Sequence, residues 1–278
     1  MAELPEVETL RRELERDIGG KRIKTVDVPG NGAIPRHSTK KQFIALLEGT
    51  KVTGMARRDL LLLTKLDSGD LLVIDLEHGG QLRRQLAKEP MAKGTRVVIT
   101  FSQGGQLRLI DDVGGMELFV TTAGKLEEEV PALQELGTDP LEEPISWTKF
   151  GEAVLRRHTK LRPLLLDRTL VAGIGPVYAD EILHAAGLRH DRETSSLSTQ
   201  EIRRLYRSLV ETVHEAAKHR GVTLADGRYL DVSGKRGGWT DDLKVYERDG
   251  LACRRCRSVV SKVRMANKPV YLCEACQV

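Results

Sequence analysis

Apolar residues recur at helical spacing near the start of the chain. This spacing predicts an amphipathic helix with Pro5 in its first turn and Gly19-Gly20 at its end. Its apolar face is formed by Val7, Leu10, Leu14 and Ile18.

From residue 21 to residue 120 the pattern changes to short β-type runs broken by Gly, Asp and Ser. Strands are expected at residues 22–28, 60–66, 71–76, 96–101, 107–110 and 117–120. Residues 67–70 and 103–105 are typical of hairpin turns, and residues 41–47 predict a helix. Residues 1–125 are therefore expected to form an antiparallel β-sandwich domain with flanking helices.

Residues 126–144 are acidic and contain three prolines, which predicts a linker. Helical spacing then returns at residues 150–155, 161–165 and 182–186, and Ser198-Thr199-Gln200-Glu201 has the form of a capping box that opens a long helix. We therefore expect a multi-domain α+β protein, with a helical domain over residues 145–225 and a separate C-terminal region over residues 226–278.

All four cysteines lie in the last 26 residues, as the pairs Cys253/Cys256 and Cys273/Cys276. Two Cys-x-x-Cys pairs at this separation are typical of a four-thiolate ribbon that binds one structural Zn²⁺, with a hairpin formed by residues 258–260 and 270–272. Two disulfides are the alternative, which the lack of a secretory signal disfavours. A redox motif is disfavoured too, because neither pair follows a strand and opens a helix.

Composition and charge narrow the choice of partner. No apolar run approaches the roughly 20 residues that span a bilayer, so we expect no membrane segment. The lack of an export signal and the paired thiols suited to metal predict a cytoplasmic location. Residues 234–268 carry ten basic and four acidic side chains, a net charge of +6 against +4 for the whole chain. Such a local excess attracts a polyanion, although a solvated basic face is the alternative. Beside a zinc hairpin, nucleic acid is the favoured partner.

A second nucleic-acid signal is the apolar turn at residues 170–175, which leads into residues 176–181. Its glycines allow close approach of the backbone to a surface, and the helix start that follows offers free N–H groups to a phosphate. A helix–helix turn without a ligand is the alternative.

Three motifs together resemble the formamidopyrimidine-DNA glycosylase and endonuclease VIII family. Residues 2–8 are similar to that family's opening signature P-E-L-P-E-V-E, and residues 165–181 are similar to its helix–two-turn–helix motif. The cysteine pairs with Gln277 are similar to its zinc finger. The resemblance covers essentially the whole chain and implies a monomeric base-excision-repair enzyme that acts on damaged DNA.

The resemblance also implies the chemistry. After removal of Met1, the amine of Ala2 attacks C1′ of a damaged or abasic nucleotide to form a Schiff base, and β/δ-elimination then nicks the strand. Glu3 moves protons, and Glu6, at a second glutamate position of the signature, is the third candidate catalytic residue beside Ala2 and Glu3. An α-amine has an ordinary pKa of about 7.7–8.0 and supplies free nucleophile at neutral pH. For Glu3 alone, an acid in the first turn of a helix is the alternative.

Several DNA contacts follow from the same resemblance. Gly173, Gly175 and Tyr178 belong to the helix–two-turn–helix motif. Arg162 resembles a basic residue near the lesion phosphate, and Lys268 stands where the zinc finger has an arginine that contacts phosphates.

Two further candidates concern the extruded base. His78 stands where the family inserts a methionine into the duplex, and the alternative is a plain loop histidine. Trp239 lies in residues 221–239, which correspond to a loop that closes over the base. There it either stacks on the base or serves as a buried anchor.

The chain departs from the family pattern at several positions. Ala2 replaces proline, Leu60 replaces a hairpin lysine and Pro176 replaces an asparagine. Residues 111–116 contain neither the arginine nor the phenylalanine that the family inserts into the duplex. Because inserted side chains offset the cost of flipping a base, we expect weak excision of 8-oxoguanine and a preference for abasic, single-stranded or bulky-adduct DNA.

Three functions remain in competition. The first is a divergent DNA glycosylase with AP-lyase activity. The second is a catalytically weak or inactive protein that binds damaged DNA on the same scaffold. The third, a zinc-ribbon transcription or RNA factor, leaves the first 125 residues without a role.

Overall fold

The computed structural model describes residues 2–29, 33–77, 79–143 and 146–278. The chain divides into two compact units. The first comprises Met1–Gln134 and Arg220–Thr240, and the second comprises Glu135–His219 and Asp241–Val278. No helix among the described residues has the length and apolar character needed to cross a membrane. The expected α+β architecture is confirmed.

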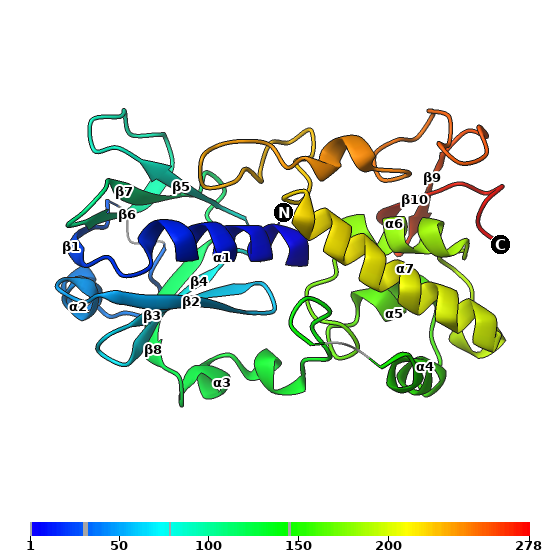
Figure 1. Cartoon of the computed structure of the whole chain (residues 1–278), viewed down its shortest axis with the longest axis horizontal. Helices are drawn as coiled ribbons and strands as arrows, with labels where there is room; N and C mark the ends of the chain where they lie inside the picture. The colour runs from blue at the N-terminus through cyan, green and yellow to red at the C-terminus, as the bar shows by residue number, and fades with distance from the viewer. Residues whose placement is uncertain (1, 30–32, 78, 144–145) are drawn as a thin grey trace. The chain divides into compact units, whose positions relative to one another are not determined.

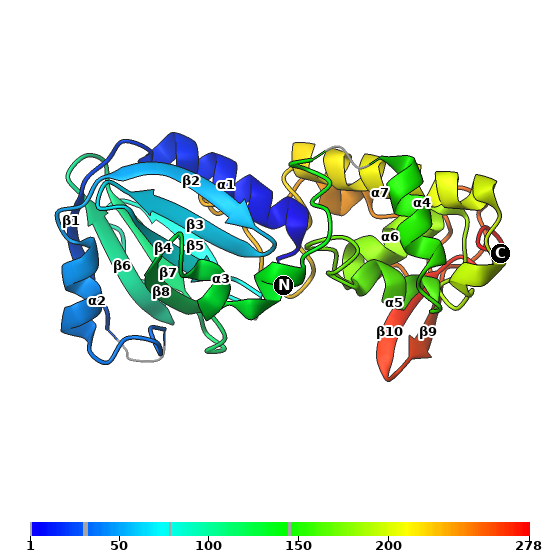
Figure 2. The ribbon, with the colours of Figure 1, turned by 90° about the horizontal axis from the view of Figure 1, so that it is seen from below.

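The first unit is built around helix α1 (Leu4–Ile18), which runs alongside strand β2 (Figures 1 and 2). Its predicted apolar face is buried, and Gly19 follows its last residue, as expected. Glu3 and Glu6 form a capping box at its start. The helix also buries polar residues on its other side, which the apolar spacing did not predict: Glu6, Glu8, Thr9 and Glu13.

Two antiparallel sheets complete the first unit and confirm the predicted sandwich. One has the order β1-β6-β7-β5 and the other β2-β3-β4-β8. The strands are β1 (Ile23–Asp27), β2 (Val52–Arg58), β3 (Leu61–Leu66), β4 (Asp70–Asp75), β5 (Gln81–Gln85), β6 (Thr95–Phe101), β7 (Gln106–Ile110) and β8 (Glu117–Thr122). The hairpin turns after β3 and β6 lie where they were expected, whereas β2 and β5 were not predicted.

Three short helices accompany these sheets. Helix α2 (Lys40–Leu47) confirms the helix predicted between the first strands. The acidic stretch predicted as a linker begins with α3 (Leu126–Glu129) and the 3-10 helix η1 (Pro131–Glu135).

Residues 220–240 return to the first unit and pack on α1 and β5. The Arg84 N–H of β5 donates to Val232 O at 2.7 Å. The Gln81 side chain donates to Gly227 O at 2.9 Å. The Val232 N–H donates to Glu13 of α1 at 3.2 Å. This segment is therefore fixed to the helix that begins at the N-terminus.

The second unit is helical, with a terminal hairpin (Figure 1). Its elements are α4 (Trp147–Leu155), α5 (Leu161–Leu166), α6 (Pro176–Ala186), η2 (Thr194–Ser196), α7 (Thr199–Lys218), β9 (Ser261–Met265) and β10 (Lys268–Leu272). The 3-10 helix η3 (Trp239–Asp242) spans the boundary between the two units in the sequence. The predicted capping box opens α7, and Gly187 ends α6 in the left-handed conformation at φ +68. The hairpin is confirmed, but its first strand starts at Ser261 and not at residue 258.

Two buried carboxylates of helix α6 accept hydrogen bonds from the backbone of the C-terminal region. Asp180 accepts the Tyr271 N–H of β10 at 2.9 Å. Glu181 accepts the consecutive N–H groups of residues 244–246 at 2.8–3.0 Å. Because charge-assisted hydrogen bonds of this kind are stronger than neutral ones, they fix both β10 and residues 244–246 to the helix.

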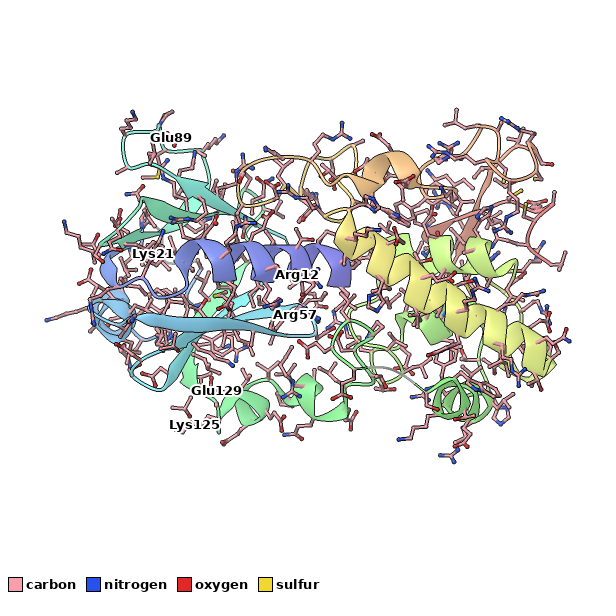
Figure 3. The ribbon with its side chains drawn as sticks, in the orientation of Figure 1. Arg12, Lys21, Arg57, Glu89, Lys125 and Glu129 are labelled. Carbon is pink, nitrogen blue, oxygen red and sulfur yellow. The ribbon has the colours of Figure 1, made fainter. Side chains whose placement is uncertain are left out.

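A buried ion network joins α1 to β2. The Glu8 carboxylate forms ion pairs with Arg12 at 2.6 Å, with Arg11 at 2.9 Å and with Arg57 at 3.1 Å, and the Arg57 side chain is fully buried. Figure 3 labels Arg12 of α1 and Arg57 of β2. Burial alone would raise the pKa of Glu8, but hydrogen bonds and charge from the three arginines outweigh it and hold the pKa at about 2. The carboxylate therefore stays ionised inside the unit.

Replacing Glu8 by Gln is expected to lower the free energy of unfolding by about 3 kcal/mol, because the Arg57 guanidinium then stays buried beside a neutral amide. The folded pKa of about 2 lies below the unfolded value of 4.5. The stabilisation is therefore complete above pH 4.5 and is lost as the pH falls towards 2. Urea unfolding of wild type and variant at about pH 7 and about pH 3 measures both effects.

Glu127→Gln is the control for this variant, because Glu127 forms an exposed ion pair with Arg58 in the same unit. Its expected cost is below about 1 kcal/mol. Equal unfolding midpoints for Glu8→Gln and wild type near neutral pH would contradict the role given to the network.

Candidate active site and metal centre

The three predicted catalytic residues lie together at the start of α1. Ala2, Glu3 and Glu6 are 8%, 3% and 2% exposed, and Ala2 belongs to the main buried apolar cluster of the unit. The helix starts at Leu4, so its first turn fixes the backbone that follows Ala2. The sequence signature thus corresponds to one ordered, mostly buried structure.

Both oxygens of Glu6 are occupied by backbone N–H groups. Oε2 accepts the Glu3 N–H at 2.9 Å, and Oε1 accepts the Val222 N–H at 2.7 Å. The neighbouring Gly221 has φ +72, and a Cβ at that position would lie 2.3 Å from Glu6 Oε1. Glu6 therefore joins the N-terminus to residues 221–222, and only glycine fits beside it.

Further contacts that the sequence did not reveal hold residues 220–240 against α1. The Arg220 guanidinium forms ion pairs with Glu13 and with Asp231, which is fully buried. Burial raises the pKa of Glu13. Asp231 also accepts the N–H groups of Ser233 and Lys235 at 2.9 and 2.8 Å. Trp239 ends this segment with its side chain 8% exposed, as in the anchor alternative.

The tip of the β2–β3 hairpin reaches the same apolar cluster as Ala2. Asp59 adopts φ 54, and Leu60 is 6% exposed within that cluster. The position at which the family has a lysine is therefore filled here by a buried aliphatic side chain.

The two segments aligned with inserting residues lie next to each other in the first unit. Gly79 and Gly80, together with residues 110–113, line a cavity of about 110 Å³. Arg228 from the 220–240 segment also lines it, and sequence reasoning did not single out this residue. His78 lies outside the described residues.

The loop beside this cavity is shaped by Asp111. Its carboxylate accepts the N–H groups of Val113, Gly114 and Met116 at 2.8–3.0 Å. Burial alone would raise the pKa of Asp111, but these hydrogen bonds lower it overall. The loop therefore keeps a defined shape without the large side chains of the family pattern.

The glycine turn in the second unit leads into α6 as the motif predicts. Gly173 adopts φ +69, and Gly175 is the residue that precedes the helix. Pro176 takes the first helical position, where its missing N–H is tolerated. Tyr178 is fully buried, so its ring packs inside the unit.

Arg162 and Lys268 occupy different environments. Arg162 is 4% exposed, donates to Asp180 at 2.7 Å and to Pro269 O at 3.1 Å, and so braces α6 against β10. Lys268 is exposed at the hairpin turn, where Ala266 and Asn267 both have positive φ. DNA contact by either residue stays a prediction.

The four cysteines form one cluster in which all four ligand atoms lie within 4.8 Å of one another. All four are free, so neither disulfide is present. The Cys253–Cys276 and Cys256–Cys273 sulfur separations are 3.9 and 3.4 Å. A tetrahedral site with Zn–S distances of about 2.3 Å requires sulfurs about 3.8 Å apart. The donor set therefore fits a four-thiolate metal site.

Two family models match the chain. The formamidopyrimidine-DNA glycosylase N-terminal domain matches residues 1–113, and the formamidopyrimidine-DNA glycosylase H2TH domain matches residues 136–226. The formamidopyrimidine-DNA glycosylases of Pelotomaculum thermopropionicum and Geobacillus kaustophilus are each 36% identical to this chain. Both alignments cover 100% of this chain, and they cover 99% and 100% of those proteins.

Solved structures agree with these matches. The MutM (Fpg) protein of Thermus thermophilus has a TM-score of 0.87 and 34% identity, covering 99% of this chain and 98% of that one. Lactococcus lactis Fpg in complex with DNA containing an abasic site has a TM-score of 0.88 and 28% identity, covering 100% of both chains. The family predicted from three sequence motifs is confirmed: this chain belongs to the formamidopyrimidine-DNA glycosylase family.

Proposed function

We propose that this protein is a DNA glycosylase with AP-lyase activity that uses the amine of Ala2 as its nucleophile. The observation that carries the proposal is the ordered start of α1, where Ala2 lies beside two buried glutamates in a chain related over its full length to such enzymes. Once Met1 is removed, the amine adds to C1′ of an abasic aldehyde and water leaves, which yields an imine. Elimination then removes a proton from C2′, forms a C2′–C3′ double bond and breaks the C3′–O bond, so the strand on the 3′ side leaves with its phosphate.

Within this mechanism, Glu3 and Glu6 have different tasks. Glu6 uses both oxygens to hold Glu3 N and Val222 N, so its task is to position the site. Glu3 is the acid adjacent to the nucleophile, and we assign proton transfer to it. A protonated imine is essential here, because a primary amine gives a neutral imine that withdraws electrons poorly.

The cysteine cluster is proposed to hold one Zn²⁺, which would fix the hairpin that presents Lys268. We also propose a preference for abasic, single-stranded or bulky-adduct DNA over 8-oxoguanine paired with cytosine. Glycines at residues 79–80 and 114–115 cannot fill the space left by an extruded base.

The alternative is a protein that binds damaged DNA without efficient chemistry. The specific observation in its favour is Leu60, an aliphatic residue buried in the same cluster as Ala2. A lysine at that place would offer a second cation to the reacting strand, and leucine offers none.

Borohydride trapping on an abasic oligonucleotide distinguishes these functions, with an 8-oxoguanine duplex as the second substrate. Wild type is expected to form a covalent adduct with the abasic strand and much less with the 8-oxoguanine duplex. A form that keeps Met1 should form none, because its terminal nitrogen is displaced from the site. Glu3→Gln should slow strand cleavage by about 10²–10⁴-fold. Tight binding of wild type without any adduct would establish the binding function instead.

Glu6→Gln is expected to loosen residues 220–240 and to lower stability by about 1–3 kcal/mol. An amide has one acceptor oxygen, so one of the two buried N–H groups loses its partner. Trypsin should cleave the segment faster, at Arg228 or Lys235. The KM for the abasic oligonucleotide should rise as well. Glu127→Gln again serves as the control, and an unchanged cleavage rate in Glu6→Gln would contradict the positioning role.

Lys268→Ala is expected to weaken binding to all DNA sequences alike and to reduce the slope of log K against log salt by about one. Gel-shift titrations over a series of salt concentrations measure this. Lys218→Ala is the matched control, because Lys218 is an exposed lysine of the same unit at the end of α7. A slope equal to that of wild type would remove Lys268 from the interface.

A further inference from the structure

A buried histidine lies against the cysteine cluster. His184, in the last turn of α6, is 2% exposed, and its Nε2 lies 3.4 Å from the sulfur of Cys253, which is fully buried. The other ring nitrogen, Nδ1, is buried and has no hydrogen-bond partner among the described residues. The ring therefore has one polar neighbour on the Nε2 side, and that neighbour is a metal-ligand sulfur.

The position of the ring proton follows from this geometry. A metal-bound cysteine is a thiolate, which accepts hydrogen bonds and donates none. A neutral imidazole with its proton on Nδ1 would place a lone pair of Nε2 against the thiolate and bury an N–H group without a partner. With the proton on Nε2 the contact is an N–H···S hydrogen bond, and Nδ1 is left as a bare acceptor. The charged ring also carries a proton on Nε2, so both protonation states give the same donor.

Cys253 needs such donors more than an exposed cysteine does. Four thiolates around one divalent ion leave a net charge of −2, and burial removes the water that would solvate the Cys253 sulfur. The backbone N–H of Arg255 supplies one donor at 3.4 Å. His184 supplies another from a different element. Cys256, in contrast, is exposed to solvent.

We propose that His184 is an outer positioning residue of the metal site. It donates its Nε2–H to the Cys253 thiolate, lowers the electron density of that ligand and holds it in the geometry that retains the metal. This inference rests on the proposed metal loading of the cysteine cluster. It also assigns a second task to α6, the helix that follows the glycine turn, because the same helix then supports the metal ligand directly.

The test compares His184→Phe with His184→Gln, whose amide can supply an N–H in a similar place. Zinc release from the purified proteins into an excess of a chromogenic chelator is expected to be about 10-fold faster for His184→Phe than for wild type. His184→Gln should restore most of the difference. His190→Phe is the matched control, since His190 is a second buried histidine of this unit whose Nδ1 also has no partner among the described residues. It should release zinc at the wild-type rate.

Two measurements on wild type keep the inference testable if His184→Phe does not fold. Nitrogen-15 shifts of the His184 ring should report a proton on Nε2, and a cadmium-113-loaded sample should show scalar coupling between the metal and that proton. An Nε2 that carries no proton, or zinc release from His184→Phe at the wild-type rate, would overturn the proposal. Purified wild type that holds no metal would instead refute the metal loading itself, and borohydride trapping reports separately on catalysis.

Discussion

The carboxylate of Glu6 determines how the proposed active site is assembled. It accepts the N–H of Glu3, close to the start of the sequence, and the N–H of Val222, far along the chain. Both contacts are buried, so the carboxylate stabilises them without competition from water. Gly221 is required beside it because any Cβ there would collide with Oε1. This one side chain therefore links the proposed nucleophile directly to residues 221–222, and the contacts of Glu13 with Arg220 and Val232 hold the rest of the segment against α1.

In the second unit, buried carboxylates again accept backbone N–H groups from distant parts of the chain. Glu181 accepts hydrogen bonds from three consecutive N–H groups at residues 244–246, and Asp180 accepts one from the N–H of Tyr271. Each carboxylate costs desolvation energy on burial, and several charge-assisted hydrogen bonds offset that cost. Two acids that are adjacent in the sequence thus connect one helix to two separate parts of the terminal region. The cysteine cluster is thereby fixed to α6 by protein contacts as well as by any bound metal.

Sequence reasoning was accurate where a local rule decides the structure. Helix α1, the capping box of α7, the glycine after α6 and the cysteine pairs all follow from spacing within a few residues. Sequence reasoning failed where the structure depends on charged partners that are distant in the sequence. Strand β5 has one buried apolar residue, Leu82, and β2 contains Arg57, whose burial requires Glu8. The ion pair of Arg162 with Asp180 was not predicted either, because this partner is recognisable only in the fold. The sequence did not indicate that His184 lies against the cysteine cluster, because an isolated histidine in a helix is common.

The replacement of lysine by Leu60 has two opposing effects on the proposed chemistry, and the replacement of proline by Ala2 adds to the unfavourable one. The apolar cluster that contains both Ala2 and Leu60 disfavours a charged ammonium, so more of the terminal amine is available to attack C1′. The same surroundings disfavour the protonated imine, which a primary amine must form before elimination proceeds. A proline imine is charged at once and avoids this step. In the proposed mechanism, strand cleavage by this chain therefore depends more strongly on Glu3 than it would with a proline nucleophile. The buried Glu3, next to the proposed nucleophile, has to deliver the proton that the imine requires.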